Sequence, residues 1–401
     1  MTGWKAHYKL HIQKWLESRY NDLINIRRHL HQFPETGFNE FETSKYLKNI
    51  LSDAGYSIVS NNEMRTGFYC DYGHGNGPII CIRSDIDALA MDDDKSVDYH
   101  SNNKGVMHGC GHDVHMTVAT GISLWIIENQ PEISGKIRFL FQPAEEQLPG
   151  GSLDMIKGGA IDNVDNIIGY HVLPKMDAGK IGIRYGAMAA TVEIIEITLT
   201  GDGGHTSRPH QTADLVLAQA HLIMELNETL SNNIDHRTPV VLAFGSIAGG
   251  DAINVIPGKI NLRGTIRYLD PGIRQTIHDL IKGAIDRVEK SSGASIIYSI
   301  PGRGPGIVND DKTTELVIRS AGETLGSGNV EILKQSSMGG EDFGNYLEKV
   351  PGAYFRLGCS NGICKDVHTI NFDVNEKCIP AAIEVLNQVI TNYFLEDSKP
   401  L

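Results

Sequence analysis

Hydrophobic residues in the first half of the chain gather in short continuous runs that alternate with helical stretches. Three such runs, at 78–83, 136–141 and 166–171, are rich in residues that favour strands. The pattern predicts a helix at 115–129 and a shorter one near 153–158. Strands that are apolar on both faces are typical of a parallel sheet covered by helices on both sides. This part of the chain therefore predicts an α/β domain built on a mostly parallel sheet.

The order of elements changes between about residues 190 and 302. The predicted elements there are a strand at 191–199, a helix at 212–230, strands at 239–247 and 259–269, a helix at 272–290 and a strand at 294–300. This βαββαβ order is typical of a ferredoxin-like α+β domain. Helices resume after it, and the last is expected at 375–394. We therefore expect residues 1–187 and 306–401 to form one discontinuous domain, with a smaller domain, 188–305, inserted into it.

Composition and charge exclude several classes of protein. The chain has 401 residues with 41% hydrophobic content, which is ample for a packed core. Its net charge of −13, without any basic block, argues against a nucleic-acid or anionic-membrane partner. The first 16 residues lack a continuous apolar segment, so we expect no signal peptide. Six cysteines are too few for a disulfide scaffold, and together these features predict a cytoplasmic protein.

The densest group of chemically active residues is Met107-His-Gly-Cys-Gly-His-Asp-Val-His115. Glycines allow the backbone to turn tightly enough for Cys110 and His112 to face one centre. A thiolate and an imidazole at this spacing suit a divalent ion such as zinc. The alternative, a polar loop whose histidines cap the following helix, has roughly even odds for an isolated cluster.

Further acidic and histidine residues follow the predicted strands. The carboxyl ends of parallel strands meet at one edge of a sheet, where ligands bind. The residues expected to converge there with Cys110 and His112 are Asp85, Asp87, Glu145, Glu146 and His171. Of two adjacent glutamates, one can bind metal while the other takes a proton from metal-bound water. Such a base needs a pKa raised towards neutrality. These residues predict a metal centre with hydrolytic chemistry.

The chain resembles the M20 metallopeptidase family. The matching segments are 27–35, 83–89, 107–115, 142–146, 201–210, 251–257, 338–343 and 367–368. They are most similar to the amidohydrolase branch, which includes hippurate hydrolases, N-acyl-amino-acid amidohydrolases and auxin-conjugate hydrolases. The resemblance implies a zinc-peptidase-like catalytic domain with an inserted lid and dimerisation domain. It also implies a metal-dependent deacylase that cleaves the linear amide bond of an N-acyl amino acid.

The resemblance also implies roles for individual residues. The implied ligands of two divalent ions, Zn²⁺ or Mn²⁺ with Co²⁺ or Ni²⁺ as alternatives, are Cys110, His112, Glu146, His171 and His368. Cys110 would bridge the two ions and Glu145 would be the general base and acid. His205 would reach the active site of a partner subunit in a homodimer or higher homo-oligomer. Asn254 and Arg267 would hold the substrate carboxylate.

Other interpretations stay open at this stage. One rival is a di- or tripeptidase of the same superfamily, and another is a metal-free cysteine hydrolase that uses Cys110. A third is a metal-storage protein without activity, although such a site has no need of a free base. The sequence assigns no role to Asp85, Asp87 or Asp113. Arg356 stands where the branch usually has an apolar residue, which leaves the polarity of the substrate pocket open.

Overall fold

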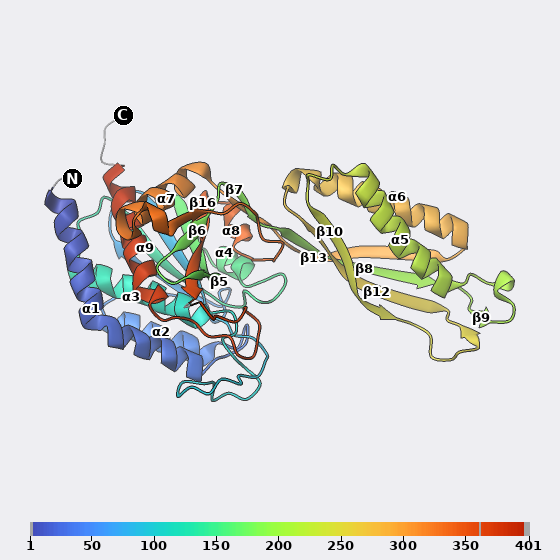
Figure 1. Ribbon diagram of the computed structural model, residues 1–401, viewed down its shortest axis with the longest axis horizontal. Helices are drawn as coiled ribbons and strands as arrows, with labels where there is room; N and C mark the ends of the chain where they lie inside the picture. Colours follow the sequence, from blue (N-terminus) through green and yellow to red (C-terminus); the bar gives the residue numbers. More distant parts are fainter. Residues whose placement is uncertain (1–2, 361, 397–401) are drawn as a thin grey trace. The chain divides into compact units, whose positions relative to one another are not determined.

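The computed structural model describes residues 3–360 and 362–396, without the side chains of residues 3–10 and 396. The described chain folds into two compact units (Figure 1). Unit 1 comprises the residues up to Met188, Ile307–Gln335 and the residues from Asp342 onward. Unit 2 comprises Ala189–Gly306 and the short segment Ser336–Glu341. That these units act as a catalytic domain and a lid stays a prediction.

Unit 1 is built on a large mixed sheet with the strand order β1-β2-β4-β3-β5-β16-β6-β15. Its strands are β1 (Ile58–Val59), β2 (Phe68–Gly73), β3 (Ile79–Asp85), β4 (Lys136–Gln142), β5 (Asn166–Asp177), β6 (Ile181–Ile183), β15 (Val330–Ile332) and β16 (Gly352–Ser360). Every residue of β3 is buried, as the continuous apolar run predicts. The three strands predicted in this region, at 78–83, 136–141 and 166–171, correspond to β3, β4 and β5.

The expectation of a mostly parallel sheet is only partly correct. The central strands β4, β3, β5 and β16 run parallel to one another, whereas β1–β2, β2–β4 and β6–β16 are antiparallel pairs. The reason is the length of the connections. A turn of three residues joins β5 to β6, and a short loop joins β2 to β3. Such links reverse the chain, because a parallel pair needs a crossover of a dozen or more residues.

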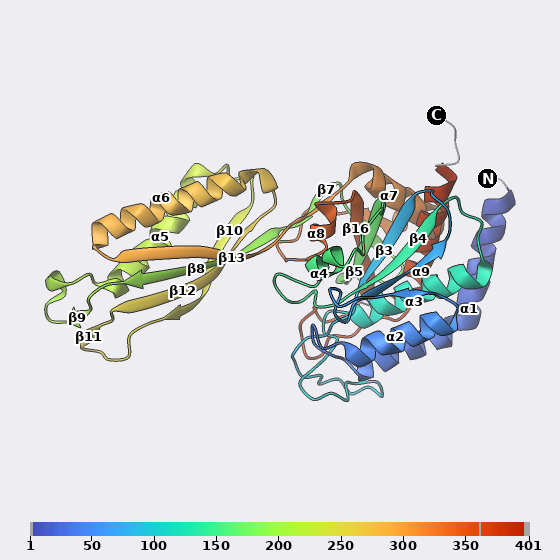
Figure 2. The ribbon, with the colours of Figure 1, turned by 180° about the vertical axis from the view of Figure 1, so that it is seen from behind.

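Helices pack against the sheet of unit 1. They are α1 (Gly3–Gln32), α2 (Phe41–Asp53), α3 (His112–Asn129), α4 (Ser152–Lys157), α7 (Asp311–Leu325), α8 (Gly344–Leu347) and α9 (Cys378–Glu396). Helix α3 contacts α1, α2 and α9, and α7 packs against α9 and β16 (Figure 1). Helices α4 and α8 contact each other (Figure 2). Helix α3 is buried along most of its length, including polar residues such as Asp113, His115 and Thr117.

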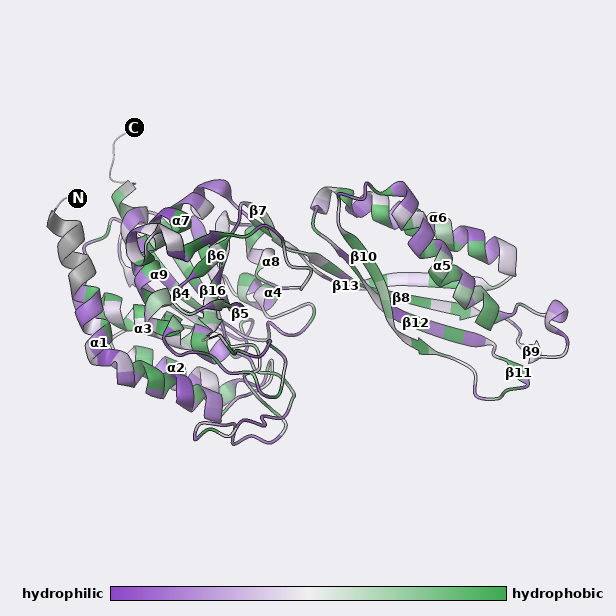
Figure 3. Cartoon of the chain, viewed as in Figure 1, coloured by the Kyte–Doolittle hydropathy of each residue, from purple (hydrophilic) through white to green (hydrophobic). Residues whose placement is uncertain are grey.

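Unit 2 has a separate antiparallel sheet with the order β10-β12-β8-β13. The elements follow the chain as β8 (Thr191–Thr200), α5 (Leu215–Asn233), β10 (Val240–Ala248), β12 (Lys259–Tyr268), α6 (Arg274–Ser292) and β13 (Ser295–Gly304). This is the predicted βαββαβ order. Hydrophobic and hydrophilic residues alternate along α5 and α6 (Figure 3). Their apolar stripes recur every three to four residues and form one core with the strands.

Shorter elements complete the fold. The strand β9 (Gly204–His205) pairs with β11 (Val255–Ile256), and β7 (Gly186–Ala189) pairs with β14 (Ile307–Asn309). Single 3-10 turns lie at η1 (Pro209–Gln211), η2 (Pro271–Ile273) and η3 (Ser327–Asn329). None of the helices in the described part of the chain combines the length and apolarity needed to cross a membrane.

Candidate metal centre

The loop before α3 brings Cys110 and His112 to the carboxyl end of the unit 1 sheet. Gly111 separates them in a left-handed conformation with φ +83°. A Cβ atom at this position would lie 2.5 Å from a methyl group of Val172. Only glycine therefore combines this backbone conformation with such a close approach to β5. Helix α3 begins directly at His112, three residues earlier than the apolar pattern predicts.

Residues from three further segments surround the Cys110 thiol. The Sγ atom lies 3.1 Å from Nε2 of His171, in the middle of β5. It lies 3.2 Å from Nε2 of His368, in the loop between β16 and α9. His368 Nε2 is also 3.1 Å from Oε1 of Glu146, which follows β4. Residues separated by more than 250 positions in the sequence thus meet at one sulfur atom.

The potential donor atoms form overlapping groups within the described residues. Cys110, His112 and His171 make one group, and Cys110, Glu146 and His368 make another, with donor atoms within 4.8 Å of each other. Cys110 belongs to both groups. His112 Nε2 also lies 3.8 Å from Oε2 of Glu145. The structure therefore brings together all five predicted ligands, with the predicted base beside them.

The chemistry of this donor set fits divalent metal ions. It combines a thiol with imidazole nitrogens and a carboxylate, which are the ligands that zinc and similar ions take in proteins. Within the described residues, the buried Nε2 atom of His112 forms no hydrogen bond. Polar atoms buried in this way are costly unless they find a partner. A bound cation would provide one.

Asp87 orients the imidazole of His112 and the backbone N–H of Glu146. The Nδ1 atom of His112 lies 2.9 Å from the carbonyl oxygen of Asp87 and 3.2 Å from its Oδ1. The other carboxylate oxygen, Oδ2, accepts a hydrogen bond of 3.0 Å from the backbone N–H of Glu146. Partners of this kind fix the orientation and tautomer of a ligating histidine. Asp87 therefore lies behind the donor atoms and turns His112 Nε2 towards Cys110 and Glu145.

Asp85 belongs to a neighbouring buried network. Its Oδ1 lies 2.6 Å from Nδ1 of His115, whose Nε2 accepts a hydrogen bond from the backbone N–H of Val172. The guanidinium of Arg83 donates to Asp85 at 2.6 Å and to Asp342 at 3.1 Å. Both nitrogens of His115 are therefore occupied by protein groups. Asp85 lies next to the ligand cluster, as expected. Its carboxylate, however, pairs with Arg83 and His115.

Asp113 ties α3 to α1. Its Oδ2 accepts a hydrogen bond of 2.7 Å from Nε of Arg27 and lies 2.7 Å from Nδ1 of His31. Burial would raise the pKa of Asp113, but Arg27 and His31 hold it well below its ordinary value. Arg27 is fully buried. The sequence assigned no role to Asp113, and no local pattern connects it with the segment 27–35.

The negative groups around Cys110 shift its pKa and that of its neighbours. Burial raises the pKa of the Cys110 thiol well above its ordinary value, and Glu146 and Glu145 raise it further. Burial would raise the pKa of Glu146 as well, but His368 and His112 lower it. The hydrogen bond to Glu146 in turn raises the pKa of His368. Glu146 is therefore held as a carboxylate, whereas the thiol needs positive charge nearby to ionise.

His112 responds to the aspartates behind it. Burial lowers its pKa, but Asp85 and Asp87 raise it to about 10. This surplus of negative charge around a buried imidazole stabilises a cation, either as a proton on the ring or as a metal ion at Nε2.

The remaining predicted site residues lie in unit 2. His205 lies in β9 and pairs with Val255 of β11, and its Nδ1 accepts a hydrogen bond from the backbone N–H of Ser207. Asn254 lies beside it, because its carbonyl oxygen accepts a hydrogen bond from the N–H of Thr206. The structure thus places His205 and Asn254 at one tip of unit 2.

Arg267 occupies a different position in unit 2. It lies in β12, and its Nη1 donates a hydrogen bond of 2.7 Å to the carbonyl oxygen of Met338. Met338 belongs to the segment Ser336–Glu341, which joins unit 2 late in the chain. The roles assigned to Arg267, His205 and Asn254 stay predictions.

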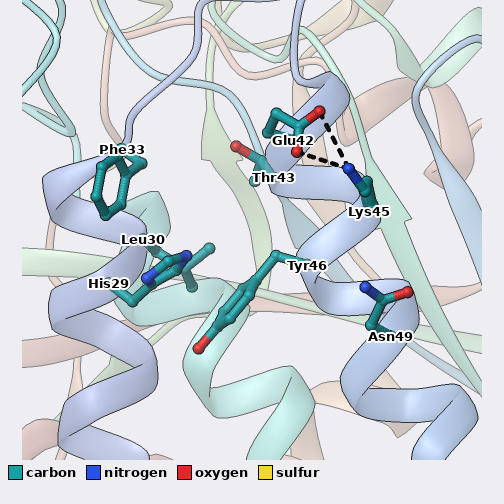
Figure 4. Close-up of a pocket in the computed structure, with 8 residues that line it drawn as sticks. All are labelled: His29, Leu30, Phe33, Glu42, Thr43, Lys45, Tyr46 and Asn49. Atoms are coloured by element: carbon teal, nitrogen blue, oxygen red, sulfur yellow. Dashed lines mark hydrogen bonds and ion pairs between the residues drawn. The ribbon is translucent and has the colours of Figure 1, made fainter.

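A cavity of about 330 Å³ lies between α1 and α2, away from the candidate ligands (Figure 4). Its lining residues are His29, Leu30, Phe33, Glu42, Thr43, Lys45, Tyr46 and Asn49. The imidazole of His29 stacks on the ring of Tyr46, and Lys45 pairs with Glu42. Among the described residues, this cavity does not bring together several potential metal-binding side chains, so the metal centre is the stronger candidate site.

Comparison with known proteins agrees with this geometry. Residues 81–392 match the peptidase family M20/M25/M40. N-acetyl-L-cysteine deacetylase of Bacillus subtilis (strain 168) is 33% identical over 96% of this chain and 88% of its own. N-acyl-L-amino acid amidohydrolase of Geobacillus stearothermophilus is 35% identical over 72% of this chain and 78% of its own.

A solved structure shows the same fold. It is the Bacillus subtilis YXEP protein, described as a dinuclear metal-binding peptidase from the M20 family. It is 28% identical and superimposes with a TM-score of 0.83, covering 94% of this chain and 99% of that one. The resemblance seen in the sequence motifs is confirmed. The chain belongs to peptidase family M20/M25/M40 and is a hydrolase.

Proposed function

We propose that this hydrolase cleaves the amide bond of N-acyl amino acids, such as hippurate-like or N-acetyl substrates. The products are a carboxylic acid and a free amino acid. The observation that carries the proposal is the position of Glu145, whose carboxylate lies 3.8 Å from His112 at the edge of the Cys110 cluster. The names of the relatives at 33–35% identity, a deacetylase and an amidohydrolase, support the same class of bond.

The residues that would hold two divalent ions are Cys110, His112, Glu146, His171 and His368. Cys110, as the member common to both donor groups, would be the shared ligand. Zn²⁺ or Mn²⁺ suits this mixed set of donors, and Co²⁺ or Ni²⁺ is an alternative. When bound, such ions polarise a carbonyl group and lower the pKa of water from 15.7 to about 7.

The side chains of the site then carry the proton transfers. Glu145 takes a proton from the attacking water and later gives it to the leaving amine, so one carboxylate serves both steps. Glu146 cannot take part in these proton transfers, because its Oε1 atom is paired with Nε2 of His368 at 3.1 Å. Asp87 keeps the Nε2 atom of His112 directed at the site throughout. We propose that His205 donates a hydrogen bond to the oxyanion, and that Asn254 and Arg267 hold the substrate carboxylate.

We propose that His205 acts from a second copy of the chain, in a homodimer formed through unit 2. Strand β10 lies at one edge of the unit 2 sheet and exposes Val241 and Ile247. Helix α5 exposes Val216, Leu217 and Met224, whereas α6 exposes no large hydrophobic residue in the described chain. An exposed strand edge beside apolar side chains is a typical site of pairing between chains.

A charged residue introduced on the edge strand β10 tests the proposed homodimer. Ile247→Asp is expected to convert a dimer into monomers, because it places a carboxylate on an exposed apolar edge. Sedimentation velocity measures the change. Ile297→Asp, on β13 at the opposite edge, is the matched control, since Ile297 is 68% exposed and Ile247 is 58% exposed. A monomeric wild type, or equal behaviour of the two variants, would contradict the proposed interface.

The lack of any disulfide supports an expected location in the cytoplasm. All six cysteines are free thiols, and five of them are buried. Such a set is typical of a reducing compartment.

The activity is tested by quantifying released amine from a substrate panel. Metal-reconstituted protein is incubated with hippurate, N-acetyl amino acids and indole-acyl amino acids, alongside dipeptides with a free amino terminus. We expect amine release from acylated substrates and little from the dipeptides. Preference for the dipeptides would assign the protein to the di- or tripeptidases instead, and stoichiometric metal binding without any release would identify a storage protein.

A further inference from the structure

Arg356 lies beside the metal centre on the central strand β16. Its strand runs parallel to β5, and Arg356 is paired in register with His171, one of the candidate ligands. On its other side Arg356 is paired with Gly182 of β6, which has no side chain. Residues at the same level on neighbouring strands share a face of the sheet. The guanidinium group therefore leaves the sheet on the same face as the imidazole of His171.

The side chain of Tyr354 lies on the same face of β16, because it comes two positions before Arg356. The only aromatic ring beneath the guanidinium is that of Tyr354 among the described residues, with its centroid 5.3 Å from Cζ. Arg356 thus places a positive charge over the ring of Tyr354, on a strand position adjacent to the candidate ligand His171.

Arg356 has no carboxylate partner, in contrast to the three fully or largely buried arginines of unit 1. Arg27 pairs with Asp113, Arg83 with Asp85, and Arg138 with Asp71. No ion pair or hydrogen bond connects Arg356 with any residue in the described chain. A partly buried guanidinium is costly to leave without an anion. Its planar donors match a carboxylate in two-point contact.

We propose that Arg356 binds a carboxylate of the substrate next to the metal centre. The inference rests on the proposed amidohydrolase function and identifies Arg356 as a residue that binds its substrate. The carboxylate has two potential sources, the α-carboxylate, which Arg356 would share with Asn254 and Arg267, or a second carboxylate in the side chain of the substrate. The two sources make different predictions for neutral and acidic substrates.

The experiment compares Arg356→Met, Arg356→Lys and wild type on N-acetyl-methionine, N-acetyl-glutamine and N-acetyl-glutamate. Methionine removes the charge and keeps an unbranched side chain. If Arg356 binds the α-carboxylate, we expect Arg356→Met to raise KM about 10- to 100-fold for all three substrates. If it binds a second carboxylate, KM rises only for N-acetyl-glutamate. In both cases kcat changes less than KM, Arg356→Lys recovers part of the loss, and the metal content is unchanged.

Binding measurements separate this inference from the proposed function. Calorimetry on metal-reconstituted Glu145→Gln, with and without Arg356→Met, gives dissociation constants for the three ligands without turnover. Weaker binding in the double variant supports the role of Arg356 even if wild type hydrolyses none of the panel. Arg19→Met, which removes a surface arginine paired with Asp22 and Glu128, is the matched control. Unchanged binding in the double variant, KM values within twofold of wild type, or loss of metal with Arg356→Met would overturn the proposal.

Discussion

Replacing Glu145 by glutamine is expected to reduce kcat by about 100-fold or more, because the amide cannot take the proton of the attacking water. Metal content should stay the same, since the atoms that surround Cys110 come from His171, His368 and Glu146. KM should change little, because the substitution keeps the size of the side chain. Steady-state kinetics combined with elemental analysis of the purified variant measures both effects.

Glu146→Gln is the matched control for this substitution. It changes the adjacent residue in the same way, but it removes a carboxylate that lies 3.1 Å from His368 Nε2. We expect this variant to lose bound metal together with activity, whereas Glu145→Gln loses activity alone. A Glu145→Gln enzyme that keeps more than a tenth of the wild-type rate would show that another group is the base.

Removal of the metal ions with a chelator is expected to abolish activity, and added Zn²⁺, Mn²⁺ or Co²⁺ should restore it. Without the ions, neither the carbonyl group nor the water is activated, and the remaining side chains provide only proton transfer. Rates before chelation, after chelation and after metal addition measure the effect. Activity that is indifferent to the chelator would favour a cysteine hydrolase that uses Cys110.

Metal uptake should weaken as the pH falls. The pKa of the Cys110 thiol is raised above its ordinary value by burial and by Glu146 and Glu145. The pKa of His112 is raised to about 10 by its aspartate neighbours, against the effect of burial. Both residues hold protons at neutral pH that metal binding must release, so protons compete with the ions. Competition titrations at pH 6 and pH 8 should give tighter binding at pH 8, and the reverse order would contradict this assignment.

The central part of the fold could be predicted from sequence because its strands are buried on both faces. Strands β3, β4 and β5 are continuous apolar runs, and α3 fills the interval between two of them. The edges of the sheet could not be predicted in the same way. Strand β6 has three residues, too few to show a period, and the direction of β2 and β6 depends on the short loops that precede or follow them.

The residues of the candidate site also differ in whether a local sequence pattern predicts them. Cys110 and His112 are recognisable from local spacing, Glu146 from its position just after an apolar run, and His171 from its position at the end of one. His368 lies in a loop without a pattern, and it reaches Cys110 because its backbone N–H donates to the carbonyl oxygen of Gly109. Contacts between segments of this kind leave no local signal. The family resemblance, rather than any periodicity, pointed to His368.

The central claim, that Cys110, His112, Glu146, His171 and His368 hold two divalent ions, is tested most directly by anomalous diffraction. Crystals grown with Zn²⁺ or Mn²⁺ are measured on either side of the absorption edge of the metal. The account predicts two peaks per chain, both within bonding distance of Cys110 Sγ. A single peak, or a peak that lies between Asp85 and His115 instead, would contradict it.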